Sequence, residues 1–264
     1  MSQLSLLTAK EISKRFGGVQ ALTDVAFTIN HGEIYGLIGP NGAGKTSLFN
    51  VLTGIYEPDG GAFVFDGEPL NRLKPNEVAE RGIARTFQNI RLFQNLSAVE
   101  NVMIGRHVRT KAGVFGAVFR DKGTLAEEAA IEKRAYELLD YVGVVKRAND
   151  LAKHLAYGDQ RRLEIARALA TEPKLLALDE PAAGMNATET QDLKRLLEDI
   201  RRDGITILLI EHDMKLVMSV CDRVLVLDYG KKIAEGTAAA VQNDPTVIAA
   251  YLGGEVALDL KGAA

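Results

Sequence analysis

The strongest chemical signal in this chain is a run of eight residues that matches the phosphate-loop pattern Gly-x-x-x-x-Gly-Lys-Ser/Thr. Its glycines let backbone N–H groups turn toward one point, where the N-terminus of a following helix adds partial positive charge. Lys45 is suited to neutralise β- and γ-phosphates, and the Thr46 hydroxyl to bind Mg²⁺. We therefore predict that this loop binds a nucleoside triphosphate with Mg²⁺. The predicted contacts are Gly39, Pro40, Asn41, Gly42, Ala43, Gly44, Lys45, Thr46 and Ser47.

Two neighbouring carboxylates form a second candidate group. Asp179 and Glu180 directly follow the apolar run 175–178, which reads as a buried strand. Asp179 is placed to hold Mg²⁺ directly or through water, and Glu180 to polarise the attacking water as a general base. Taken alone, the pair would be a surface turn before Pro181, but behind a phosphate loop the catalytic interpretation is favoured.

Two further polar residues give weaker signals. The Gln88 amide could reach the metal and the nucleophilic water, although glutamines are common on protein surfaces. His212 follows the apolar run 206–210 and could hydrogen-bond the γ-phosphate, although a lone His at a strand end is usually structural.

The residues around these groups predict the elements that position them. A buried strand at 34–38 precedes the phosphate loop, and apolar residues at 48, 49, 51 and 52 predict a buried helix after it. Alternation over 25–30 indicates a half-buried antiparallel strand, and 63–67 reads as another strand and turn. Strands at 174–178 and 206–210 flank a helix that we expect to begin at Thr188, with Gln191 as its capping partner. This order indicates a parallel sheet covered by helices.

The middle third of the chain has a different pattern. Apolar residues at helical spacing over 124–142 and 163–170 predict a mainly helical insert across residues 89–172. Before the helical pattern at 124–142, residues 106–122 mix basic with apolar side chains. That segment is either a solvated loop with a few buried anchors or a contact region near a membrane or partner.

Composition narrows the class of protein. The 264 residues are 47% hydrophobic and 25% charged, as in soluble globular proteins, and the net charge of −3 disfavours nucleic acid as the main ligand. Cys221 is the only cysteine, so we expect no intrachain disulfide and a reducing cytoplasm. We see no signal peptide and no apolar stretch near the ~20 residues of a membrane helix. Membrane association would therefore require a partner.

A glycine-bearing turn provides a second helix N-terminus able to meet an anion. Its residues are Leu155, Ala156, Tyr157, Gly158 and Asp159, and an amphipathic helix follows. Here the chain resembles the ATP-binding cassette (ABC) family, whose signature Leu-Ser-Gly-Gly-Gln precedes a helix of this kind. The phosphate loop, Gln88, the signature turn, the Asp179–Glu180 pair and His212 follow the family's order, and Phe16 falls where its adenine-stacking aromatic lies.

The resemblance implies a fold. We expect one α/β domain over 1–264, with a phosphate-loop NTPase core, an antiparallel β subdomain and an inserted helical subdomain. Residues 1–88 and 173–242 would form the β subdomain and RecA-like core, 89–172 the helical subdomain, and 243–264 a C-terminal tail.

Three segments look like one subgroup, the ATPase subunits of branched-chain amino acid importers. They are 180–186, 210–218 and the tail motif within 243–253. The resemblance implies ATP hydrolysis with Mg²⁺ by a peripheral subunit at the cytoplasmic face of the cell membrane. Its partners would be a second ABC ATPase, usually a paralogue in a pseudo-twofold dimer, and two membrane permease subunits. A periplasmic or extracellular solute-binding protein would act indirectly, and no nucleic acid would be involved.

Alternatives remain at the level of the sequence. The ATPase of a urea or other small-solute importer, or of a lipid- or lipopolysaccharide-extracting ABC system, would carry a similar cassette. A soluble ABC protein of DNA repair or ribosomes is disfavoured by a single cassette without long heptads.

The signature turn also departs from the family pattern. Ala156 replaces the signature Ser, Asn186 replaces a loop Asp, and Asp159 stands where a neutral residue is usual. The Asp159 carboxylate would either repel the ATP of the opposite subunit or cap a helix that begins at Gln160.

Overall fold

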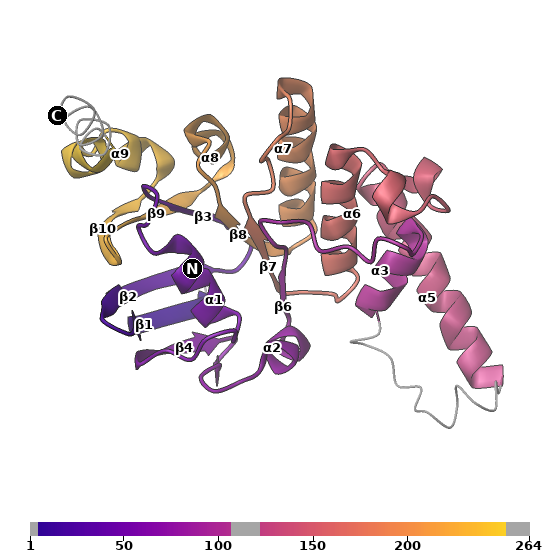
Figure 1. Ribbon diagram of the computed structural model, residues 1–264, viewed down its shortest axis with the longest axis horizontal. Coiled ribbons are helices and arrows are strands. Elements are labelled where there is room, and N and C mark those ends of the chain that lie inside the picture. The colour runs from indigo at the N-terminus through magenta and orange to yellow at the C-terminus, as the bar shows by residue number, and fades with distance from the viewer. Residues whose placement is uncertain (1–4, 107–121, 252–264) are drawn as a thin grey trace. The chain divides into compact units, whose positions relative to one another are not determined.

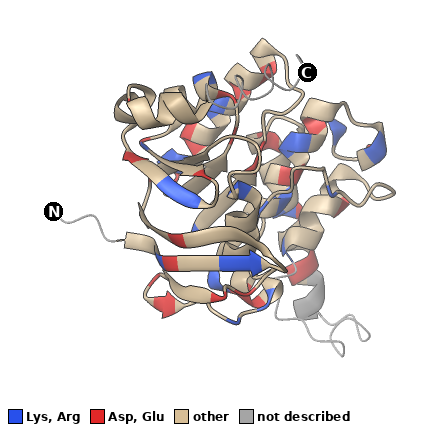
Figure 2. Ribbon diagram, turned by 60° about the vertical axis from the view of Figure 1, so that its left-hand side comes forward, with Lys and Arg blue, Asp and Glu red and all other residues tan. Residues whose placement is uncertain are grey.

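The computed structural model describes residues 5–106 and 122–251 (Figure 1). The chain divides into two compact units, Met1–Val78 with Leu197–Ala264, and Ala79–Leu196. Residues 107–121 lie outside the described part, so neither interpretation of the 106–122 segment is tested. Basic and acidic residues are interspersed over strands and helices alike (Figure 2).

The first unit contains an antiparallel sheet with strand order β2-β1-β4-β5. Its strands are β1 (Ser5–Phe16), β2 (Val19–Asn30), β4 (Gly60–Phe65) and β5 (Glu68–Pro69). In β2, Val25, Phe27 and Ile29 are buried while the residues between them are partly exposed. The predicted half-buried antiparallel strand is therefore confirmed.

A set of largely parallel strands in the same unit carries the phosphate loop. Strand β3 (Ile34–Ile38) pairs in parallel with β8 (Thr206–Ile210) and β9 (Arg223–Asp228), and β10 (Lys231–Gly236) runs antiparallel to β9. Every residue of β3 and β8 is buried. Leu37 is opposite Ile210, so the segments that follow β3 and β8 leave the sheet at one edge.

The helices of this unit follow or flank those strands. They are α1 (Lys45–Leu52), α8 (Met214–Val220), α9 (Ala238–Gln242) and a helical stretch over 245–251. Helix α1 buries Leu48, Phe49, Val51 and Leu52, the four positions predicted.

The second unit is mainly helical around two short parallel strands, β6 (Ile83–Arg85) and β7 (Leu175–Asp179). Helix α3 (Ala98–Arg106) packs against α5 (Lys122–Tyr141) and α6 (Tyr157–Leu169). The helices predicted at 124–142 and 163–170 are thus present as α5 and α6. Helices α2 (Pro75–Arg81) and α7 (Ala187–Arg202) each cross a boundary between the units.

The start of α7 corrects one expectation. The helix begins at Ala187 rather than after Thr188. The Glu189 amide donates to Asn186 Oδ1 at 3.0 Å, and the Asn186 amide donates to the Glu189 carboxylate at 2.9 Å. Asn is at least as good an N-cap as Thr, and Glu three residues later completes the reciprocal pair. The departure at Asn186 therefore has a local role.

Candidate functional site

Close backbone packing determines the path of the phosphate loop. Gly39 has φ +150°, and a Cβ there would lie 2.1 Å from the Leu227 carbonyl oxygen at the end of β9. Gly44 has φ +102°, and its Cβ would lie 2.8 Å from the Ala21 oxygen. Only glycine fits either position, because any side chain would collide with backbone that cannot move aside.

Hydrogen bonds also hold the phosphate loop in place, and together with the close glycine packing they form a backbone enclosure around the loop. The Gly230 amide, in the turn between β9 and β10, donates to the Ala43 oxygen at 2.9 Å, and the Thr23 amide donates to the Gly230 oxygen at 2.8 Å. Lys45 Nζ donates to the oxygens of Gly39 at 2.7 Å and Pro40 at 3.0 Å. Helix α1 begins at Lys45, so its first amides lie at the loop end of the helix, as an anion site requires, and the second residue, Thr46, is exposed.

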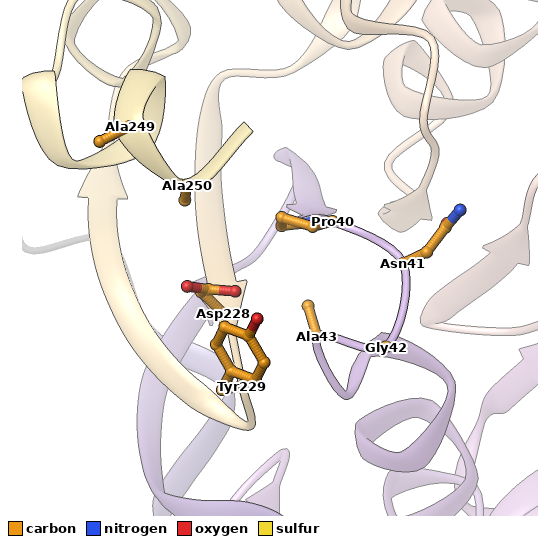
Figure 3. A pocket seen from close by; sticks show the side chains of 8 residues that line it. All are labelled: Pro40, Asn41, Gly42, Ala43, Asp228, Tyr229, Ala249 and Ala250. Carbon is orange, nitrogen blue, oxygen red and sulfur yellow. The ribbon is translucent and has the colours of Figure 1, made fainter. Parts of the chain in front are cut away.

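A pocket of about 300 Å³ adjoins the loop, between it and the C-terminal helical stretch (Figure 3). It is lined by Pro40, Asn41, Gly42, Ala43, Asp228, Tyr229, Ala249 and Ala250. Next to Ala250, the Tyr251 hydroxyl is buried, and burial raises its pKa while the Gly39 amide acts in the opposite direction. Sequence reasoning missed this wall of the pocket, although it had singled out the tail as a motif. The last residues of that motif, Leu252 and Gly253, lie outside the described residues.

Two other candidates belong to the same unit. Phe16 ends β1 and is 39% exposed, and its ring makes an edge-to-face contact with Tyr56 at 5.0 Å between centroids. An exposed ring held in this way suits stacking on a base. His212 follows β8, at the sheet edge where β3 continues into the phosphate loop, and its side chain is 65% exposed.

In the second unit, the two carboxylates and Gln88 come together. Asp179, buried at the end of β7, donates its amide to the Thr86 hydroxyl at 3.2 Å. Glu180 follows with φ +49°, a strained conformation that non-glycine residues rarely adopt and that is frequent at active sites. Gln88 Nε2 donates to Glu180 Oε2 at 3.1 Å, so the predicted glutamine contacts the predicted base. Burial lowers the pKa of the nearby Arg85 guanidinium to about 10, and the Asp179 carboxylate opposes that shift.

The signature turn is the start of α6 itself. The helix begins at Tyr157, with Ala156 as a cap that makes no side-chain hydrogen bond, and Leu155 is buried before it. Asp159 therefore lies in the first turn of the helix, and the expectation that it caps a helix opening at Gln160 is wrong. The extended conformation needed for an N-cap is adopted three residues earlier, at Ala156.

Two buried charges in α6 were not expected from the sequence. Arg161 is 2% exposed and Glu164 is 1% exposed, and both contact the backbone around Gln88. Their spacing of three residues on a helix is a possible signal for an ion pair, but surface pairs have the same spacing. Burial raises the pKa of Glu164, and the amide of Arg91 with the charges of Arg167 and Arg161 opposes that rise.

The loop, the signature helix and the carboxylate strand together define a phosphate-loop nucleotide-binding cassette. The ABC transporter family model matches residues 22–183, more than half of the chain, and the chain belongs to this family of nucleotide-binding ATPases. A second family model, branched-chain amino acid ATP-binding cassette transporter, matches residues 231–257. The expected ABC ATPase fold and activity class are thereby confirmed.

Individual relatives cover almost the whole chain. The high-affinity branched-chain amino acid transport ATP-binding protein LivG of Salmonella typhimurium is 44% identical over 96% of this chain and 99% of its own length. The lipopolysaccharide export ATP-binding protein LptB of Escherichia coli is 36% identical over 95% of this chain and 98% of its own. A crystal structure of an ABC transporter cassette in its ADP conformation has a TM-score of 0.82 and 32% identity, covering 95% of this chain and 99% of that one.

No helix within residues 5–106 and 122–251 combines the length and the apolarity needed to cross a membrane.

Proposed function

We propose that this chain is the ATP-hydrolysing subunit of an ABC importer for branched-chain amino acids. The observation that carries the proposal is the match of residues 231–257 to the branched-chain cassette model, in a chain whose catalytic motifs are those of an ABC ATPase. The matched segment includes β10 and the helical stretch beside the phosphate loop. Part of the matched segment therefore lines the pocket beside the loop that we propose to bind nucleotide.

The lipopolysaccharide alternative has less support. LptB is 36% identical to this chain and LivG is 44% identical, at nearly equal coverage. Only a transport assay can distinguish an importer of branched-chain amino acids from an importer of urea or other small solutes, because the cassette contacts no transported solute.

The chemistry would be shared among residues of both units. Lys45 and the amides at the start of α1 would bind the phosphates, and Glu180 would polarise the attacking water, with Gln88 and His212 helping to orient water and γ-phosphate. The positive φ of Glu180 and its contact with Gln88 support this role. Phe16 would stack on the adenine.

Magnesium suits the donors that these residues offer. Mg²⁺ takes oxygen ligands, retains several waters and is usually bound by one or two protein groups together with substrate phosphates. The exposed Thr46 hydroxyl, the Asp179 carboxylate and the Gln88 amide oxygen are groups of this type. We propose that they hold the ion, which would neutralise charge on the β- and γ-phosphates.

The proposed partners follow from the signature turn. The N-terminus of α6, from Leu155 to Asp159, would meet ATP held by a second ABC ATPase subunit, in a head-to-tail pair. Closure and opening of this pair would drive two membrane permease subunits. A solute-binding protein would deliver solute to the permease, and the ATPase would lie at the cytoplasmic face of the membrane.

Replacing Glu180 by Gln tests the catalytic assignment. We expect hydrolysis to fall by roughly 10²–10⁴, about 3–5 kcal/mol of barrier, while ATP still binds, because Gln retains the shape and loses the charge. Turnover is measured in the assembled transporter, with the exposed Glu132 in α5 changed to Gln as the matched control. Near-native turnover of Glu180→Gln would remove Glu180 from the role.

Reconstitution tests the substrate. The transporter is purified from detergent extract through this chain, its membrane subunits are identified, and uptake into proteoliposomes is followed with labelled leucine and labelled urea. We expect ATP-dependent uptake of leucine alone. Uptake of urea without leucine, or copurification with a lipopolysaccharide export complex, would contradict the proposed substrate and leave the ATPase assignment intact.

A further inference from the structure

A buried ion pair lies in the first turns of α6. Arg161 Nη1 is 3.6 Å from Glu164 Oε2, and both side chains are almost completely buried. A buried pair is weak evidence for stability, because the loss of hydration offsets much of the attraction. Its contacts with the rest of the unit therefore need a specific explanation.

Those contacts converge on one peptide segment. Glu164 Oε1 accepts hydrogen bonds from the amides of Phe87 and Arg91, each at 3.4 Å. Arg161 Nη1 donates to the Phe87 oxygen at 2.8 Å, and Nη2 donates to the Gln88 oxygen. The pair thus holds Phe87 through both its amide and its carbonyl. The planar guanidinium suits this task, because its donors are fixed relative to one another.

The Phe87 ring adds a second restraint on the same segment. The guanidinium of Arg85 is 4.4 Å from the ring centroid and that of Arg91 is 4.5 Å from it. Backbone and side chain of residue 87 are therefore both held. The next side chain, Gln88, is directed to Glu180.

The same guanidinium also reaches the signature turn. Arg161 Nη2 donates to the Tyr157 hydroxyl at 2.8 Å, and its Cζ is 5.3 Å from the Tyr157 ring centroid. Tyr157 is the first residue of α6. The Arg161 side chain therefore contacts two parts of the unit. One is the signature turn, which we propose to meet ATP bound by the opposite subunit. The other is Gln88, which contacts the proposed base Glu180.

We propose that Arg161 and Glu164 are positioning residues for ATP hydrolysis, which hold Gln88 against Glu180 and tie its position to the signature turn. The proposal rests on the function proposed above, because it assigns a part to the same site. Neither residue touches the reacting atoms. A purely structural pair would support α6 without acting through Gln88.

A double-mutant cycle separates these two roles. Arg161→Lys retains the positive charge but loses the planar guanidinium with its several fixed N–H donors. In the assembled transporter we expect it to lower kcat about tenfold, with the KM for ATP within about twofold. In a Gln88→Ala background, the same change should lower kcat less than about twofold, because the side chain through which Arg161 acts is gone. Equal losses in the two backgrounds, or no loss in the native one, would overturn the proposal.

Matched variants test whether a loss of kcat comes from any change in α6 or from a failure to fold. Arg162→Met removes the neighbouring arginine of the same helix. Within the described residues, Arg162 pairs with Asp192 at 3.2 Å and forms no hydrogen bond with residues 87–88, so kcat should stay within about twofold. If Arg161→Lys does not fold, Glu164→Gln is used, since it preserves side-chain shape and an acceptor oxygen. Its smaller loss, about threefold, should likewise vanish in the Gln88→Ala background.

The outcome is independent of the ATPase assignment. Hydrolysis by the unmodified transporter and its loss in Glu180→Gln report on the proposed function. If those results hold while Arg161→Lys behaves additively with Gln88→Ala, only the positioning role fails.

Discussion

The phosphate loop and the segment around Gln88, which contacts the signature helix α6, are held in different ways. In the first unit, glycines at 39 and 44 lie against the backbone of β9 and β2, and the turn at Gly230 closes the enclosure. In the second unit, the buried side chains of Arg161 and Glu164 hold the segment around Gln88.

The two regions therefore tolerate different kinds of substitution. A backbone enclosure has no spare space, so one added methyl group disrupts it, whereas the surrounding side chains can vary. The segment around Gln88 should instead be sensitive to side-chain substitution, because the identity of two charged groups, Arg161 and Glu164, determines how it is held. The first region is fixed by backbone packing, and the second by side-chain hydrogen bonds.

The largest expected effect comes from breaking the backbone enclosure. Gly39→Ala would place a methyl group 2.1 Å from the Leu227 oxygen, so the loop must leave its path and nucleotide binding should be lost. Gly18→Ala is the control, because its Cβ would have no neighbour within 4 Å. Titration with a fluorescent ATP analogue measures both. Near-native affinity in Gly39→Ala would show that the loop is not held as described.

Removing the positive charge of the phosphate loop tests whether the backbone geometry alone is sufficient for tight ATP binding. Lys45→Ala leaves the glycines in place but removes the counter-charge that we propose for the triphosphate, so tight binding should also be lost. Lys10→Ala, at an exposed position of β1, is the control. If Lys45→Ala still bound ATP tightly in the same titration, the backbone amides would be the dominant contact.

The adenine end of the first unit should be less sensitive. We expect Phe16→Ala to weaken ATP binding by about 0.5–1.5 kcal/mol, through lost stacking. Val19→Ala, at a nearby position that is 68% exposed, should change nothing measurable. A loss at Phe16 larger than that at Lys45 would reverse the two assignments.

The smallest effect is expected at the signature turn. Asp159 lies in the first turn of α6, partly exposed, where its charge favours the helix but would repel phosphate across a dimer. Asp159→Gln should tighten ATP-driven association by up to about 1 kcal/mol, because the site is solvated. The ATP concentration at half-maximal association is compared with that of the native chain. An unchanged value would limit Asp159 to its effect on the helix.

The same contrast explains how far the sequence could be interpreted. The phosphate loop was predictable because glycine spacing is itself the structural requirement, and β3 and α1 follow from local apolar patterns. The start of α7 was misplaced because Asn186 and Thr188 both suit an N-cap, and only the Glu189 contact distinguishes them. Arg161 and Glu164 could not be predicted, because their partners at 87–91 lie more than seventy residues away.

The buried environment of Cys221 has a practical consequence. It is the only cysteine, its Sγ lies 3.0 Å from where a Cβ on Gly36 would be, and burial raises its pKa to about 12. A thiol that is shielded and almost fully protonated reacts slowly with maleimides. Single surface cysteines can therefore be introduced for labelling or crosslinking without first removing the native one, for example at Tyr229, which is 85% exposed beside the nucleotide loop.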